Sequence, residues 1–377
     1  MKETNVQKSA KKRETNMELL RIVAMLMVLI QHCVGRGLLL GNPSINISNL
    51  ILIRVLDSLA QVANASFLFI TGYYMINKKF NLKRILNLWG KTILYSLIIF
   101  VICSFLGIYA DALAFLFPIT FGEYWFISAY IALYFLLPII NILLNKLTQR
   151  QFKYFLIALI VMLGVISVIS NPGGIFSGNI FPVIMFYSIG AYIKRFVKVK
   201  PNGRYFIKYI LLTFIFVLTY VIVEIIQKST TNSYIYLRLC YILDGLRKDE
   251  CIILVAMAIC FFMKLRTINI KSTLANRLIS FIAPSMFSIY IIHESLALRD
   301  YIWQNAGLMN YANSWMMIPY ILLVVLIVFI VCLLIDLLRR VIYTLLKKIP
   351  IINKGVQKIN EKIDKLNTKI NSIFESE

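Results

Sequence analysis

Charged residues are scarce in this chain of 377 residues: only 15% are Asp, Glu, Lys or Arg, while 60% are hydrophobic. A soluble globular domain carries about 25% charged residues and roughly half apolar ones. This shortage argues against a soluble enzyme, a nucleic-acid binder or a secreted disulfide scaffold. A helix needs ~20 apolar residues to cross a bilayer, and long uncharged runs occur at 22–30, 93–105 and 318–335. We therefore predict an all-α, polytopic membrane protein.

Metal-ligand patterns are also missing. No cysteine has a CxxC or CxxH spacing, and most lie inside apolar runs: Cys33, Cys103, Cys240, Cys251, Cys260 and Cys332. Such a pattern predicts neither a zinc site nor a disulfide framework, and we expect no bound metal or cofactor. The apolar run over 17–40 is too long for a signal peptide and lacks a small-residue cleavage site, so it is predicted to be a retained first helix.

Acidic residues number 17 against 40 Lys and Arg, which gives a net charge of +23. In a membrane protein such an excess marks the cytoplasmic loops. The loops alternate between basic ones, such as 78–91, and ones without Lys or Arg, such as 109–123. This alternation places both termini in the cytoplasm and predicts ten spans, at 17–40, 50–76, 88–109, 124–145, 152–170, 177–196, 205–227, 250–264, 276–298 and 315–345.

The chain divides into a basic arm over 1–16, a membrane domain over 17–346 and a cytoplasmic helical tail over 347–377. The tail carries a heptad stripe of Ile352, Val356, Ile359, Ile363, Leu366, Ile370 and Ile373. Such a stripe is typical of a short coiled coil, which would make a homo-oligomer, or of a basic amphipathic helix on the anionic inner leaflet. The sequence leaves both alternatives open.

The chain has two histidines, His32 and His293, and both lie inside predicted spans. Ionisable groups in the hydrocarbon region are costly, which points to function. Arg21 precedes His32 by eleven positions, about three helical turns or ~16 Å, so the two share one face. An Arg at the water interface suits phosphate binding, and a buried His suits general-base catalysis. Alternatively, Arg21 only sets the helix end. His293 is predicted at the depth of His32, where the two rings can meet.

Five segments recur in an order that is typical of one family. The first runs from Glu18 to His32 and has an Arg, ten residues and a His. The others are Phe67–Tyr73 (F-x-x-S-G-Y/F, with Thr71 where Ser is commoner), Lys83–Arg84 (a basic stretch without its usual third basic residue), Tyr124–Tyr130 (an aromatic segment containing Trp125) and Ser288–His293 (S-x-Y-x-x-H, containing Tyr290). Over 17–345 the chain thus resembles the membrane-bound acyltransferase-3 family.

Members of that family transfer acetyl, succinyl or similar groups from acyl-coenzyme A to sugars of surface polysaccharides, lipopolysaccharide or peptidoglycan. The resemblance implies that Arg21 binds the phosphates of acyl-coenzyme A and that His32 is the catalytic base. Lys83 and Arg84 would help to hold the nucleotide. Gly72 either allows close approach near the donor channel or only packs two helices. His293 is expected to orient His32 or the acceptor.

Asp57, Gln61 and Asn64 recur at i, i+4 and i+7 and form one polar stripe in the second span. The stripe is expected to line a wet cavity or the bundle interior, for sugar binding or for interhelical hydrogen bonds. Glu123 and Trp125 stand at the outer mouth of the fourth span, where Trp is also typical of an interfacial anchor. The other candidates for supporting the site or binding the acceptor are Glu18, Thr71, Tyr73, Tyr130 and Tyr290.

The sequence thus predicts an enzyme of the bacterial plasma membrane that moves an acyl group, with acetyl expected, from cytoplasmic acyl-coenzyme A to a sugar hydroxyl. The acceptor would be a surface glycan or its lipid-linked precursor, and nucleic acid is not an expected partner. A transporter or flippase of a polysaccharide intermediate is the alternative, but it gives no purpose to the spacing of Arg21 and His32. A glycan polymerase would need a larger outer loop than 228–249.

Overall fold

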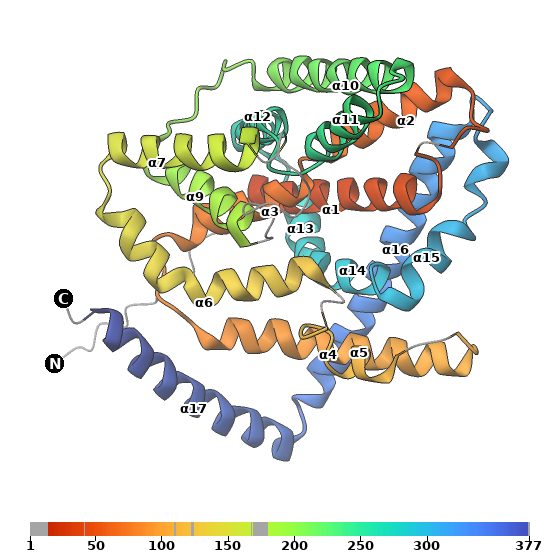
Figure 1. Cartoon of the computed structure of the whole chain (residues 1–377). Helices are drawn as coiled ribbons and strands as arrows, with labels where there is room; N and C mark the ends of the chain where they lie inside the picture. The colour runs from red at the N-terminus through yellow and green to blue at the C-terminus, as the bar shows by residue number, and fades with distance from the viewer. Residues whose placement is uncertain are drawn as a thin grey trace.

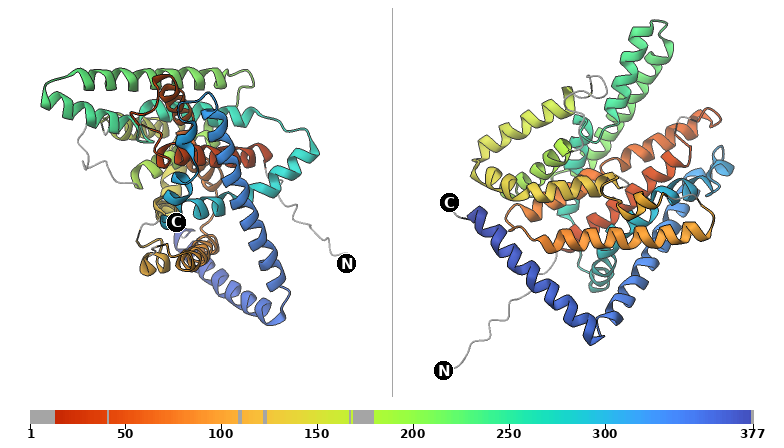
Figure 2. Two further views of the ribbon diagram at one scale, coloured as in Figure 1. Left: turned by 90° about the vertical axis from the view of Figure 1, so that its right-hand side faces the viewer. Right: turned by 60° about the horizontal axis from the view of Figure 1, so that its bottom comes forward.

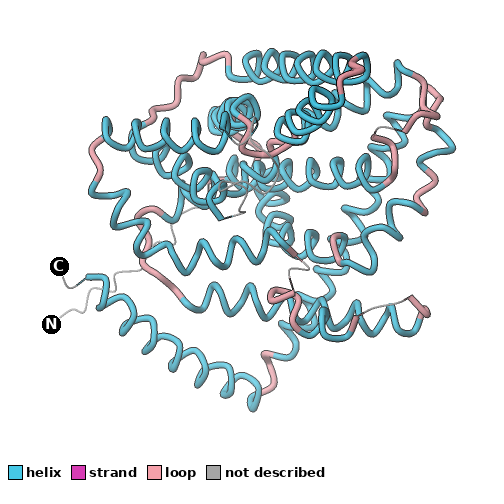
Figure 3. The backbone as a smooth tube through the Cα atoms, in the orientation of Figure 1, coloured by secondary structure: helices cyan, strands magenta, loops and turns pink. Residues whose placement is uncertain are grey.

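The computed structural model describes residues 14–40, 42–108, 111–121, 124–166, 168 and 180–375. Within these ranges every regular element is a helix (Figure 3). Eight segments there are long and apolar enough to cross a membrane. The prediction of an all-α, polytopic membrane bundle is therefore confirmed.

The eight segments follow the apolar runs of the sequence. They are α1 (Thr15–Arg36), α2 with α3 (Ile47–Ala60 and Ala63–Met75), α4 (Leu82–Phe105), α6 (Trp125–Lys146), α7 with a π-helical end (Gln149–Val161 and Met162–Ile166), α10 (Tyr205–Ser229), α13 to α14 (Thr273–Ile282 and Met286–His293) and α16 (Met317–Leu346). The spans expected at 177–196 and 250–264 correspond to α9 (Ile180–Phe196) and α12 (Ile252–Thr267), which have 17 and 16 residues. The count of ten and the cytoplasmic termini stay predictions.

Several expected spans differ from the structure in their bounds, and three of these differences lie near the site. The first helix ends at Arg36, before residue 40, and the second is interrupted between α2 and α3 at Gln61 and Val62. The span expected over 276–298 ends at His293, and a 3₁₀ turn containing Pro284 interrupts it. Proline lacks the amide hydrogen that a continuous helix needs. These ends and breaks lie beside the polar residues described below.

The remaining helices are short or lie at the ends of the bundle. They are α5 (Ala112–Leu116), α11 (Ser233–Leu246), α15 (Leu296–Gln304), the 3₁₀ helix at Leu308–Tyr311 and α17 (Pro350–Glu375). Contacts tie α1 to α2, α3, α12, α13, α14, α15 and α16. Figure 1 accordingly shows α1 in the middle of the bundle, with α10 to α12 on one side of it and α14 to α16 on the other. A central helix is well placed to carry a site.

Helices α3 and α9 cross at two glycines. A Cβ on Gly72 would lie 1.9 Å from the backbone oxygen of Tyr187, and one on Gly190 would lie 2.2 Å from that of Phe69. Only a residue without a side chain fits at such a crossing. The structure thus favours the packing alternative for Gly72 over a place beside a channel.

A buried carboxylate, Asp336 of α16, joins three parts of the bundle. It accepts hydrogen bonds from Tyr95 of α4 at 2.7 Å, from Ser285 at 2.6 Å and from Arg339 at 2.9 Å. Both carboxylate oxygens have donors, as a buried charge requires. This network holds α4 and the 283–285 turn against α16.

The tail forms α17, which turns back from α16 toward the start of α4 (Figure 2). Asn367 accepts a hydrogen bond from the backbone amide of Leu82 at 2.7 Å, and Asn371 donates one to the carbonyl of Phe80 at 3.0 Å. Ile363 is buried, whereas Ile359 remains exposed. The tail is helical as predicted, and the heptad stripe packs in part on its own chain; the choice between coiled coil and membrane-surface helix stays open.

Candidate functional site

The two histidines meet, although they are 261 positions apart. Nδ1 of His32 lies 3.0 Å from Nε2 of His293, and the ring centroids are 5.1 Å apart. The sequence-based expectation that both rings lie at one depth is therefore confirmed. His32 comes from the C-terminal half of α1, and His293 is the last residue of α14.

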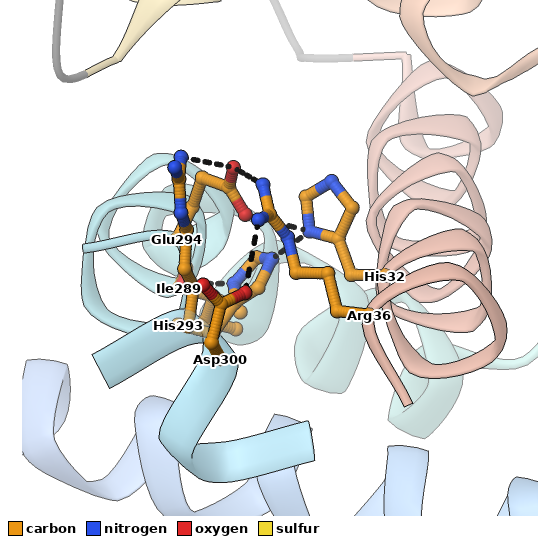
Figure 4. A network of polar contacts seen from close by, with 7 residues as sticks. His32, Arg36, Ile289, His293, Glu294 and Asp300 are labelled. Atoms are coloured by element: carbon orange, nitrogen blue, oxygen red, sulfur yellow. Dashed lines mark hydrogen bonds and ion pairs between the residues drawn. The ribbon is translucent and has the colours of Figure 1, made fainter. Parts of the chain in front are cut away.

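A carboxylate and two arginines complete the cluster (Figure 4). One oxygen of Glu294 lies 3.0 Å from Nδ1 of His32. The other oxygen is paired with Arg36, one turn after His32 on α1, and lies 3.5 Å from Arg299. Arg36 also reaches the exposed Asp300 at 3.3 Å. The end of α1 and the turn between α14 and α15 thus build this site together.

The partners of His293 fix the proton positions in both rings. Nδ1 of His293 lies 2.6 Å from the carbonyl oxygen of Ile289, which can only accept, so this nitrogen carries the hydrogen. In the neutral ring Nε2 of His293 is then an acceptor, and Nδ1 of His32 must donate to it. The lone pair of His32 consequently sits on Nε2, the nitrogen that has no dashed contact in Figure 4. His32 is therefore arranged as a base.

Glu294 is placed to stabilise a positive charge on His32. The oxygen that faces His32 is buried and makes no hydrogen bond within the described part of the chain. If His32 takes up a proton on Nε2, this oxygen lies 3.0 Å from the ring nitrogen that shares the charge. The arrangement is suited to proton transfer at His32.

A cavity of about 360 Å³, called the inner cavity below, lies beside the N-terminal half of α1. Its wall includes a stripe of α1 at spacings of three, four and three residues: Glu18, Arg21, Met25 and Val28. His32 follows Val28 by four positions and so continues the same stripe. Tyr290 forms part of the opposite wall, and its ring lies 6.0 Å from that of His293. The cavity thus runs from Arg21 to Tyr290, which contacts His293, but its lining does not include His32 or His293 themselves.

The cavity wall is mostly apolar beyond its mouth. Asn64, Thr71 and Tyr130 contribute polar groups, and the other walls come from side chains such as Phe67 and Phe126. At the mouth, Arg21 is paired with Glu18 at 2.8 Å, and the second oxygen of Glu18 is buried and accepts no hydrogen bond from the described residues. A cation at one end and apolar walls beyond it suit a long ligand with an anionic head.

Several predicted residues lie elsewhere. Lys83 and Arg84 begin α4 and are not part of the cavity wall; Arg84 contacts the sulfur of Met75 at 2.6 Å. Tyr73 is buried beside Arg266, whose guanidinium carbon is 4.9 Å from its ring centre. Trp125 is exposed at the start of α6, as expected for an interfacial anchor. Glu123 lies outside the described residues.

The predicted polar stripe of the second span lines cavities, as expected. Asn64 contributes to the inner cavity and donates a hydrogen bond to Asp249 at 2.8 Å. Asp57 and Gln61 line a second cavity, called the outer cavity below, and Gln61 donates a hydrogen bond to Asp57 at 3.3 Å. Both readings of the stripe therefore have a basis in the structure: it makes an interhelical hydrogen bond, and it borders space for a ligand.

A metal ion could also be held here by His32, His293 and Glu294, since one ligand atom from each lies within 4.8 Å of the others. Two observations favour a proton-transfer site instead. The 3.0 Å contacts at His32 Nδ1 are shorter than the about 3.3 Å between two ligands of a tetrahedral zinc ion. Arg36 and Arg299 also hold positive charge against Glu294, which disfavours a second cation there.

Three residues of the site were not predicted from the sequence: Glu294, Arg36 and Arg299. One signal was present: Glu294 directly follows an intramembrane histidine, and a carboxylate at that depth needs a partner. Arg36 carried a weaker signal, because it lies one turn after His32 on the same face. No sequence signal pointed to Arg299, because its position depends on the turn between α14 and α15.

Comparisons with known proteins identify the family of the chain. The model of a family described as an acyltransferase domain matches residues 14–337, which include α1, both cavities and the histidine pair. No curated protein and no solved structure matches the chain.

Proposed function

The chain belongs to the acyltransferase-3 family, and on that premise we propose that it transfers an acyl group, with acetyl expected, from cytoplasmic acyl-coenzyme A to a hydroxyl of a surface polysaccharide or its lipid-linked precursor. The proposed location is a bacterial plasma membrane. Acyl-coenzyme A would act as a substrate, with no bound cofactor required.

The inner cavity is the proposed donor site. Arg21 at its mouth would bind phosphate groups, for which a guanidinium is well suited. The pantetheine chain would follow the apolar walls, with Phe67 and Phe126 beside it. About 16 Å of helix separates Arg21 from His32, so the donor spans the distance with its thioester near the histidine pair.

The proposed reaction has His32 as general base. Nε2 of His32 takes the proton of the sugar hydroxyl while the hydroxyl oxygen attacks the thioester carbonyl carbon. The new C–O bond forms, the C–S bond breaks, and His32 returns the proton to the leaving thiolate. Glu294 stabilises the transient imidazolium, and His293 keeps Nδ1 of His32 protonated, so that Nε2 remains the basic nitrogen.

The single observation that carries this proposal is the stripe of α1. One helix face holds a phosphate-binding cation at the mouth of a cavity and, three turns later, a histidine whose free lone pair is fixed by its neighbours. A channel for a polysaccharide intermediate would not require this combination.

The proposal can be tested in membrane vesicles that contain the full chain and a glycan acceptor preparation. Labelled acetyl-coenzyme A is supplied on the cytoplasmic side, and free coenzyme A and labelled glycan are measured. Arg21→Gln should raise KM for acetyl-coenzyme A about tenfold or more, because a charge-assisted contact is lost. With acetyl-pantetheine, which has no phosphate, Arg21→Gln and wild type should behave alike.

Arg150→Gln is the matched control, since it removes the same charge from a residue that stacks on Tyr154 away from the cavity. An equal KM effect of Arg21→Gln on both donors would contradict phosphate binding. No turnover of acetyl-, propionyl- or succinyl-coenzyme A by wild type would overturn the enzyme and favour the transporter.

A further inference from the structure

A second cavity, of about 410 Å³, lies between α2, α10 and α11. Its volume is within the ~300–1,000 Å³ typical of small-molecule sites. Its lining comes from the half of α2 that precedes Gln61 and from the half of α10 that leads to Glu224 and Gln227. Because α1 ends and α2 begins on this side, the cavity lies in the half of the bundle opposite Arg21.

Charged groups line this outer cavity within the apolar bundle. Arg54 of α2 is paired with Glu224 of α10 at 2.7 Å, and its guanidinium carbon lies 4.8 Å from the ring centre of Tyr220. Asp244 and Arg247 of α11 complete the charged lining. Ionisable residues within spans are costly and mark binding sites or pathways. The donor reaction proposed above uses none of these groups.

Gln61 gives the clearest sign of a ligand. Its side chain is 7% exposed and lines the cavity, and its amide nitrogen donates to Asp57 at 3.3 Å. Its amide oxygen is buried and accepts no hydrogen bond from any described residue. A buried acceptor without a donor is costly, and a ligand hydroxyl in the cavity would satisfy it.

The charge of the lining disfavours a polyanionic ligand. Three carboxylates, Asp57, Glu224 and Asp244, stand against two guanidiniums, and Lys228 pairs with Glu224 at 3.0 Å from the edge. Phosphates or uronic acids would meet carboxylates without a compensating excess of cations. Carboxylates, amides and guanidiniums together offer both donors and acceptors, which matches a ring of hydroxyl groups.

The span formed by α2 and α3 contributes lining residues to both cavities. Asp57 and Gln61 face the outer cavity, and Asn64, on the same stripe, faces the inner one. Asn64 also donates a hydrogen bond to Asp249, which follows Arg247 of the outer cavity by two positions. The linings of the two cavities are therefore only three positions apart in sequence, at Gln61 and Asn64.

We propose that the outer cavity binds the acceptor as an uncharged or amino sugar ring, with Gln61, Asp57 and the Arg54–Glu224 pair as the groups that hydrogen-bond its hydroxyls. This inference rests on the acyltransferase function proposed above. It adds the site and the class of the acceptor, and it assigns the residues that select against acidic sugars.

The test measures binding separately from acyl transfer. The full chain in detergent is incubated with methyl glycosides of glucose, galactose, N-acetylglucosamine, glucosamine and glucuronic acid, and its Tm is recorded. At least one neutral or amino glycoside should raise the Tm of wild type, and the glucuronide should not. Gln61→Leu and Tyr220→Leu should abolish the rise. Thr219→Val, next to Tyr220 but bonded within its own helix, should keep it.

Acyl transfer is followed in parallel on the same vesicles as before. Gln61→Leu should lower acceptor-dependent release of coenzyme A at least tenfold, with KM for acetyl-coenzyme A unchanged. The inference is overturned if no glycoside raises the Tm, if the glucuronide does so equally, or if both cavity variants keep the rise. Failure of the acyltransferase function itself would show differently, as a lack of turnover in wild type together with a normal Tm response.

Discussion

Glu294 and Asp336 are both buried carboxylates next to an arginine, but their hydrogen bonds differ. Asp336 has donors on both oxygens, from Tyr95, Ser285 and Arg339. Among the described residues, arginines contact one oxygen of Glu294, and its other oxygen faces His32 without a hydrogen bond. The fully bonded acid has no remaining capacity and holds helices together. The partly bonded acid retains capacity for a charge that forms during a reaction.

This difference separates structural from functional polar groups in a bundle where burial alone does not. A network whose members are all satisfied contributes stability. An unsatisfied acceptor costs free energy in the resting state and is retained at sites that act on a ligand or proton. The comparison leads to four predictions, from the largest effect to the smallest.

His32→Ala should produce the largest loss. Removal of the general base is expected to lower kcat by about 10²–10⁴-fold, with KM for acetyl-coenzyme A little changed. The variant should reach the membrane at wild-type levels, because His32 is only partly buried. A kcat within threefold of wild type would show that His32 is not the base.

Glu294→Gln should lower kcat by roughly 10–100-fold, because the imidazolium loses its neighbouring charge. Asp300→Asn is the matched control: it removes a charge that contacts the same Arg36 but is exposed, and activity should stay near wild type. Equal losses in both variants would indicate that the overall charge of the outer face matters rather than the contact with His32.

Asp336→Asn should lower the stability of the protein and leave its activity nearly unchanged. It weakens a satisfied buried network and is expected to cost about 1–3 kcal/mol of stability, measured as a lower Tm in detergent. The activity of the folded fraction should stay within a few-fold of wild type at a low assay temperature. The comparison with Glu294 breaks down if Asp336→Asn lowers kcat as strongly as Glu294→Gln without changing Tm.

A chelator should have no effect on turnover. Dialysis of vesicles against EDTA, followed by assay with and without added zinc, is expected to leave kcat unchanged, since the histidine pair is interpreted as a proton-transfer site. Loss of activity that zinc restores would instead assign a metal to His32, His293 and Glu294, and the role of Glu294 would be that of a ligand.

Helical periodicity made part of the site predictable. Arg21 and His32 belong to one helix, so their shared face follows from local backbone geometry. The polar stripe at Asp57, Gln61 and Asn64 was found in the same way, and all three residues border cavities. Lys83 and Arg84 were placed by resemblance alone, and the structure keeps them away from the inner cavity wall.

The sequence by itself determined the membrane class, the apolar spans and the α1 stripe, because composition and helical period act within a single segment. The tertiary structure decided that His293, Glu294 and Arg299 lie beside the end of α1, and that the breaks after Gln61 and near Pro284 border the two cavities. These features depend on which helices pack together across more than 250 positions of sequence. Packing of that range is set by side-chain fit between distant segments, and no local pattern encodes it.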